Sequence, residues 1–178
     1  MGFFSKDIET IDDLIVHTLQ DIDYAEQRIL QTLPTMIKKA TNLQLRSAFE
    51  HHLAETRNHL HRVERVFEMH GVERETVHCP AIDGIIQEAD EVSGEVDDKQ
   101  VLDATLIAAA DAALIAAAQA IKHYEISRYG TLIAWVKQLG HNDCASVLER
   151  NLEEEKAADQ KLTHIAESQV NVQASLSA

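Results

Sequence analysis

Hydrophobic residues recur every three or four positions along most of the chain, which is the spacing of one face of an α-helix. The first such stretch has apolar positions at Ile8, Ile11, Leu14, Ile15, Leu19, Ile22, Ala25, Ile29, Leu30 and Leu33. We expect Pro34 to bend or break this helix, because proline lacks the backbone N–H and clashes with the preceding turn. A second helix is predicted from Leu43 to His70, and Gly71 is placed to end it as a C-cap residue.

The second half of the chain repeats this arrangement. A short helix is predicted between Pro80 and Val92, inside a longer connection, and long helices are predicted at 99–139 and 142–168. Two helical hairpins joined by one crossover have the connectivity of ferritin-like bundles. The pattern therefore predicts an all-α protein, a ferritin-like four-helix bundle with one crossover and a short extra helix, over residues 1–168. The small and polar residues 169–178 predict a disordered tail.

Composition narrows the possible partners and location. Aromatic residues make up only 4% of the chain, which favours packed helices over a sheet. The formal net charge of −14 argues against nucleic acid or an anionic membrane surface as a partner. The longest apolar run, LIAAADAALIAAA, is too short to cross a bilayer. Two cysteines outside any C-x-x-C pair and a start without an apolar leader lead us to expect a cytoplasmic protein.

One segment of the second helix is unusually rich in histidine. The sequence HHLAETRNHLHR at 51–62 contains four imidazoles and one glutamate. At about 100° per residue, His52, Glu55 and His59 fall within a sector of roughly 60° beside core positions, whereas His51 and His61 point elsewhere. This stripe is therefore placed to face the bundle interior.

The other long helices carry possible partners for this stripe. Glu26 lies next to a core position of the first helix, and Glu125 is embedded in apolar sequence of the third. In the fourth helix, Glu155 and Asp159 repeat the four-residue spacing of the glutamate and histidine in the second. The two hairpins thus offer similar ligand sets, as a pseudo-twofold metal site requires. Carboxylates and imidazoles suit iron or manganese, and the lack of a cysteine cluster argues against structural zinc.

A resemblance to a known family becomes specific at these segments. The chain from about residue 5 to 167 resembles the bacterial YciE/YciF family of ferritin-like proteins, through DIDYAEQRILQTLPTMIKKA, FEHHLAETRNHLHRVERVFE, HYEISRYGTLIAWVKQLGH and LEEEKAADQKLTHIAE. This resemblance implies a cytoplasmic, stress-associated bundle, commonly a homodimer, with a di-metal site similar to that of rubrerythrin.

The resemblance also implies metal ligands. It assigns one carboxylate to each long helix: Glu26, Glu55, Glu125 and Glu155. The usual ferritin-like element is Glu-x-x-His, but the positions that should hold histidine are Asn58 and Ala158. His52 and His59 are therefore alternative nitrogen ligands of the second helix, and Asp159 stands where a second histidine would.

These observations favour a di-metal protein of iron or manganese that acts on peroxide or oxygen, with Glu55 and Glu155 bridging the two ions. Two alternatives stay open. The chain could be a non-catalytic dimeric stress protein with a weak or vestigial metal site, or a purely structural bundle without metal, since acidic residues on long helices are usually solvated.

Overall fold

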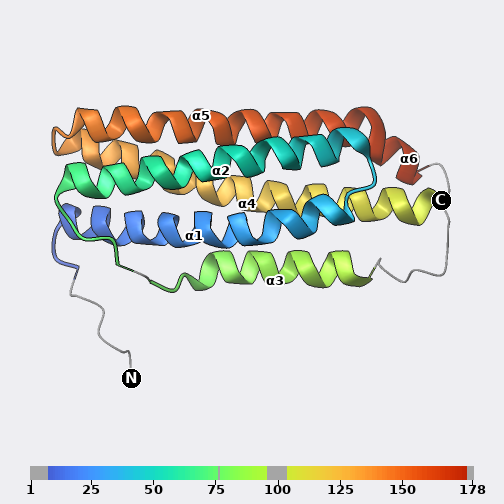
Figure 1. The fold of residues 1–178 in the computed structure, drawn as a ribbon, viewed down its shortest axis with the longest axis horizontal. Helices are drawn as coiled ribbons and strands as arrows, with labels where there is room; N and C mark the ends of the chain where they lie inside the picture. Colours follow the sequence, from blue (N-terminus) through green and yellow to red (C-terminus); the bar gives the residue numbers. More distant parts are fainter. Residues whose placement is uncertain (1–7, 76, 96–103, 176–178) are drawn as a thin grey trace, which may run out of the picture.

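The computed structural model describes residues 8–75, 77–95 and 104–175. Four long helices lie side by side (Figure 1): α1 (Ile11–Lys39), α2 (Leu43–His70), α4 (Ala104–Gln138) and α5 (Asn142–Ile165). Helices α1 and α2 form one hairpin, and α4 and α5 form the other. Helices α2 and α4 run in the same direction, because the connection between them returns along the bundle (Figure 1). The predicted all-α, ferritin-like bundle with one crossover is confirmed.

The helix ends follow the local sequence signals. Thr10 caps α1 by accepting a hydrogen bond from the backbone N–H of Asp13, whose carboxylate in turn accepts one from the backbone N–H of Thr10. Asn42 caps α2 through its side-chain oxygen. Gly71 ends α2 in the left-handed conformation at φ 76°, which glycine adopts without steric cost. The predicted bounds of α2 are confirmed.

Two segments differ from the sequence prediction. Helix α1 continues through Pro34 to Lys39, so of the two predicted effects, a bend or a break, the break does not occur; Met36 beyond the proline is buried in the core and keeps this last part of the helix packed. The chain is also helical after α5, as a π-helical turn (Ala166–Val170) and the short helix α6 (Asn171–Ser175). The predicted tail at 169–178 is therefore helical as far as residue 175, because Val170 is buried and α6 packs against α4. Residues 176–178 lie outside the described part.

The crossover contains α3 (Pro80–Glu95), which lies beside α1 (Figure 1) and packs against α1 and α4. Asp83 ties it to α1: its two carboxylate oxygens accept hydrogen bonds of 2.7 Å from Arg28 Nε and from Tyr24 Oη. The short extra helix predicted from residue 80 is confirmed, and it extends to Glu95. The predicted start of the third long helix, Lys99, lies outside the described residues.

One buried carboxylate joins the two hairpins. Asp111 interrupts the apolar run of α4 and accepts three hydrogen bonds from the α1–α2 loop, from Thr41 N (2.9 Å), Thr41 Oγ1 (2.7 Å) and Asn42 N (2.8 Å). An aspartate in otherwise apolar sequence thus holds the loop that starts α2.

The core between the long helices is apolar towards both ends and polar in the middle. Buried side chains fill it on either side, including Ile15, Leu19, Ile29, Phe49, Phe67, Ile115, Leu132, Leu148 and Leu162. None of the described helices combines the length and the hydropathy needed to traverse a lipid bilayer.

Candidate metal centre

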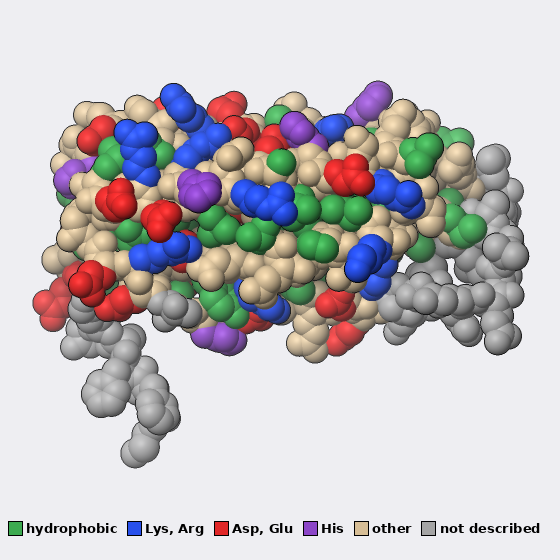
Figure 2. Space-filling view, in the orientation of Figure 1, with side chains coloured by type: hydrophobic (Ala, Val, Ile, Leu, Met, Phe, Trp, Pro, Cys, Tyr) green, Lys and Arg blue, Asp and Glu red, His purple; other side chains and the backbone are tan. Residues whose placement is uncertain are grey.

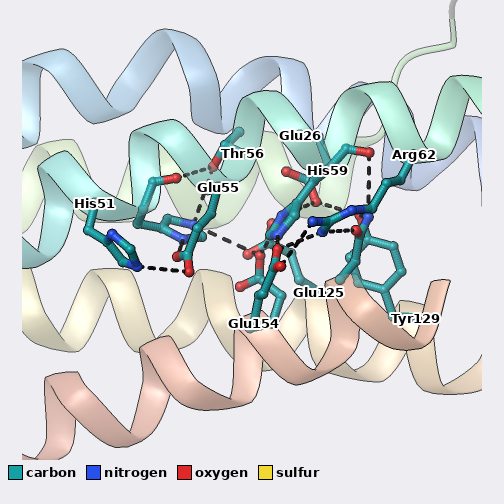
Figure 3. A network of polar contacts seen from close by, with 12 residues as sticks. Glu26, His51, Glu55, Thr56, His59, Arg62, Glu125, Tyr129 and Glu154 are labelled. Atoms are coloured by element: carbon teal, nitrogen blue, oxygen red, sulfur yellow. Dashed lines mark hydrogen bonds and ion pairs between the residues drawn. The ribbon is translucent and has the colours of Figure 1, made fainter. Parts of the chain in front are cut away.

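The polar middle of the core draws one or two side chains from every long helix. Each of the following is no more than 6% exposed: Glu26 on α1, His52 and His59 on α2, Lys122 and Glu125 on α4, and Glu155 on α5. Figure 3 shows the labelled Glu26, His59 and Glu125 pointing into the space between the helices. Within the described residues, two groups of three have ligand atoms within 4.8 Å of one another, and Glu155 belongs to both.

The first group is Glu26, His59 and Glu155. His59 Nδ1 lies 3.2 Å from Glu26 Oε1 and 3.0 Å from Glu155 Oε1. Among the residues that the structure describes, Glu26 Oε2 has no hydrogen-bond partner although it is buried. A buried acceptor without a partner is costly, so this oxygen is available to a cation.

The opposite side of the His59 ring is held by a second carboxylate. His59 Nε2 lies 2.9 Å from Glu154 Oε2, and Arg62 binds Glu154 through two nitrogens at 2.6 and 3.0 Å. Because an ionised carboxylate only accepts hydrogen bonds, Nε2 must carry the proton. Metal-binding histidines characteristically donate their other ring N–H to a carboxylate in this way.

Glu26 is oriented by a similar chain of contacts. Tyr129 Oη donates to Glu26 Oε1 at 2.5 Å, and Asn151 Nδ2 donates to Tyr129 Oη at 2.9 Å. Asn151 Oδ1 accepts from Arg62 Nη1 at 2.9 Å. The first group is therefore enclosed by a connected hydrogen-bond network from α2, α4 and α5.

The second group, His52, Glu125 and Glu155, surrounds the side chain of Lys122. Lys122 Nζ lies 2.5 Å from His52 Nε2 and 2.5 Å from Glu155 Oε2, and it forms an ion pair with Glu125 Oε2. Since an ammonium group only donates, His52 Nε2 must be unprotonated and Nδ1 must donate to Glu55 Oε2, 3.3 Å away. The tautomer of His52 is thus set by Lys122.

Proton positions in the centre follow from these contacts. Burial alone would lower the pKa of His59, but Glu26 and Glu155 outweigh it and raise the pKa to about 11. Burial and Lys122 lower the pKa of His52, so its imidazole is neutral. Burial and the nearby Glu155 carboxylate raise the pKa of Glu125 well above its ordinary value. Burial would also raise the pKa of Glu155, yet Lys122 and His52 lower it, so this carboxylate stays ionised.

The structure brings together most of the residues expected from the sequence. Five of the seven lie in the two groups: Glu26, His52, His59, Glu125 and Glu155. Glu55 lies outside both groups, at the edge of the cluster, where it contacts His51 at 3.1 Å and His52. Asp159 lies one turn further along α5 and contacts Gln119 and His123. Glu155, and not Glu55, has the shared position between the groups.

Sequence reasoning did not identify Lys122, Arg62, Asn151 or Glu154. Lys122 could have been found, because it lies three residues before Glu125 and therefore on the same face of the helix. Lysine is almost always solvent-exposed, so Lys122 was not considered as a core residue. The other three gave no such signal, since their roles depend on contacts between α2 and α5.

A mainly apolar pocket of about 140 Å³ reaches the cluster from outside. Its walls include Leu33, Phe49 and Leu162, and the polar side chains that line it include Glu55 and Lys122. The molecular surface carries apolar side chains gathered along the middle of one face, flanked by basic, acidic and histidine side chains (Figure 2). A small molecule could thus approach the second group from the pocket.

Comparison with known proteins identifies the family of this bundle. Residues 10–175 match the domain of unknown function DUF892. The chain belongs to the DUF892 family. A curated relative, Protein YciF of Escherichia coli strain K12, is 39% identical over 168 residues, which cover 94% of this chain and 96% of the relative. The resemblance to the YciE/YciF family is confirmed.

Several solved structures are similar to this chain. YcfI of Rhodopseudomonas palustris, thought to be a structural protein, is 50% identical with a TM-score of 0.82, over 90% of this chain and 98% of that chain. The E. coli stress protein YciF is 38% identical with a TM-score of 0.81, over 92% and 99%. A protein from Xanthomonas campestris at 18% identity has a TM-score of 0.69, over 92% and 94%, and shares the fold.

Proposed function

We propose that this DUF892 chain is a stress-response protein that binds iron or manganese in the core of its helical bundle, at Glu26, His59 and Glu155. The observation that carries the proposal is the pairing of buried, mutually facing ligand atoms with an unsatisfied oxygen, Glu26 Oε2, among the described residues. A cation at this position would satisfy that oxygen and the charge of two buried carboxylates.

The donor set fits the proposed ions. Carboxylate oxygens are hard ligands and an imidazole nitrogen is a borderline one. A site with two carboxylates and one imidazole suits manganese and ferrous iron. Glu154 and Arg62 fix the His59 ring so that Nδ1 faces the carboxylates, and Tyr129 fixes Glu26. Metal would displace the proton from His59 Nδ1, so binding would release a proton. A bound ion would supply Lewis-acid and redox chemistry.

A second candidate function is turnover of peroxide or oxygen. The pocket favours it, because its apolar walls lead from the surface to His52 and Lys122, which contact Glu155 of the proposed site, and would admit a small uncharged molecule. In that case Glu55 and His51 would lie at the polar end of the entry path. The alternative is a stress protein that holds metal without turnover.

The protective role proposed for this chain rests on its relatives. A relative is called a stress protein and another is thought to be structural, which supports a protective role for this chain as well. We propose a homodimer in the cytoplasm. The two buried free thiols, Cys79 and Cys144, are compatible with a reducing compartment.

Elemental analysis of protein purified without an affinity tag tests metal binding. Wild type loaded anaerobically with ferrous iron or with manganese should retain metal after gel filtration. Glu155→Gln should lose it, because the only carboxylate shared by the two groups of the described core is removed. Glu153→Gln, a change of the same kind at an exposed neighbour, should behave as wild type. Wild type that retains no more metal than Glu155→Gln would contradict the proposal.

Peroxide consumption separates the two functions. Metal-loaded protein that consumes peroxide faster than the same concentration of free ion would support turnover. Protein that binds metal and slows peroxide consumption would support sequestration.

A further inference from the structure

The ammonium group of Lys122 occupies the place where the second group would hold a cation. Nζ lies within hydrogen-bonding distance of His52 Nε2 and donates to Glu155 Oε2, and it forms an ion pair with Glu125 Oε2. These residues are also the three members of the second potential metal group. One ligand atom of each member therefore already faces a positive charge from the same protein, and of the two Glu125 oxygens only Oε1 lies outside this ion pair.

Burial and charge make Lys122 a fixed part of this arrangement. Its side chain is 4% exposed and its two carboxylate partners are fully buried. A buried ammonium is stable only when it is paired and hydrogen-bonded, and here both conditions are met. Moving a divalent ion into the group would bring it within contact distance of a positive charge, at a large electrostatic cost in a low-dielectric interior.

The first group contains no lysine side chain, and its nitrogen, His59 Nδ1, is a ring atom that can bind an ion once its proton has left. Glu26 Oε2 is buried without a hydrogen-bond partner among the described residues, and Lys122 reaches only the other side of Glu155. Glu155 divides its two oxygens between the groups, with Oε1 towards His59 and Oε2 towards Lys122. The two halves of the polar layer are therefore not equivalent, in contrast to the symmetric ligand sets of the sequence pattern.

We propose that Lys122 is a built-in replacement for the second metal ion, so that the bundle holds a single ion per chain, bound by Glu26, His59 and Glu155. This inference rests on the proposed metal binding and changes its stoichiometry from the two ions expected from the sequence. Glu125 is then a partner of Lys122 and not a metal ligand in the natural chain.

Equilibrium dialysis against Mn²⁺, followed by elemental analysis and electron paramagnetic resonance of the bound ion, tests this proposal. Wild type should bind one Mn²⁺ per chain at saturation and give the spectrum of an isolated ion. Lys122→Ala should bind two, with the broadened spectrum of an exchange-coupled pair, because His52, Glu125 and Glu155 are released. Lys161→Ala, the same change at an exposed lysine of the same pocket, should still bind one.

A conservative variant keeps the test decisive if Lys122→Ala does not fold. Glu125→Gln should leave the stoichiometry at one ion, with an unchanged spectrum, because Glu125 is not a ligand in the natural chain. Two ions in wild type, a single ion in folded Lys122→Ala, or loss of the ion in Glu125→Gln would each overturn the role of Lys122 and leave metal binding itself intact. A wild type that binds no Mn²⁺ or iron would overturn the proposed function and this inference together.

Discussion

The ring of His59 shows how one residue is prepared for binding by its neighbours. One nitrogen faces two buried carboxylates, and the other faces Glu154, which is itself held by Arg62 through two hydrogen bonds. Burial acts to raise the pKa of Glu154, but the bonds from Arg62 and His59 outweigh it and lower the pKa, so Glu154 stays ionised at neutral pH. The direction in which Nδ1 points is therefore set before any ion arrives.

At this scale, removing the charge behind His59 should weaken metal binding without removing a ligand. In Glu154→Gln we expect the dissociation constant for Mn²⁺ to rise by about 10- to 100-fold, since outer partners of metal ligands typically contribute that much. Titration calorimetry would measure it, with the exposed Glu153→Gln as the control. Equal affinities for the two variants would show that Glu154 does not orient His59.

How far the site could be predicted also depends on single residues. His52 and His59 were placed on an inward face because helical periodicity alone fixes the direction of a side chain. Periodicity also places Lys122 inward, but its burial depends on pairing with Glu155 of another helix, and sequence spacing contains no information about that contact. Glu55 and Asp159 lie outside the two groups. A small rotation of a helix about its axis turns residues at the edge of its inward-facing side away from the core.

Each helix is placed by a few specific contacts as well as by its apolar face. The α1–α2 loop is fixed by Asp111 of α4, and α3 is fixed by Asp83, which pairs with α1. Capping residues and terminal glycines are local signals, so the limits of α2 were predictable. The continuation through Pro34 and the helix after α5 were not, because both depend on packing of Met36 and Val170 against other helices.

At the scale of the element, loss of Asp111 should loosen the connection between the hairpins. Asp111→Ala leaves the donors of Thr41 and Asn42 without their acceptor, and we expect the free energy of unfolding to fall by about 2 kcal/mol. Urea denaturation followed by circular dichroism would measure the change. Asp111→Asn retains one acceptor oxygen and should lose less. An alanine variant as stable as wild type would mean that water replaces these hydrogen bonds without cost.

The stability that the contacts of Asp83 with α1 contribute should depend on pH. Burial acts to raise the pKa of Asp83, but hydrogen bonds from Tyr24 and Arg28 outweigh it and lower the pKa below its ordinary value. A carboxyl with a lowered pKa in the folded state stabilises above its unfolded pKa and loses this contribution as pH falls through the folded value. The difference in stability between wild type and Asp83→Asn should therefore be present at pH 7 and shrink in the acid range below about 3.8.

Comparing urea midpoints of these two proteins at neutral and acid pH would check this prediction. The effect should be modest, because Asp83 is partly exposed and its ion pair is screened. A difference that grows towards acid pH would show that the contact acts in another way.

For the molecule as a whole, the bundle was predictable because it follows from the number of amphipathic stretches and the lengths of their connections. The composition of its polar layer was only partly predictable, because it depends on the vertical alignment of four helices. That alignment decides which of the acidic and imidazole side chains meet at one level, and the sequence spacing within each hairpin constrains it only in part.

The buried position of Lys122 has a consequence for how the two hairpins find their alignment during folding. Each hairpin can form from contacts local in sequence, which favours early formation. Sliding one hairpin past the other by a helical turn, about 5.4 Å, would preserve much of the apolar contact but would separate His52 from Lys122 and His59 from Glu155, leaving these buried groups without their partners from the other hairpin. The polar layer therefore selects one alignment of the two hairpins. It disfavours shifted packings that a purely apolar core would tolerate.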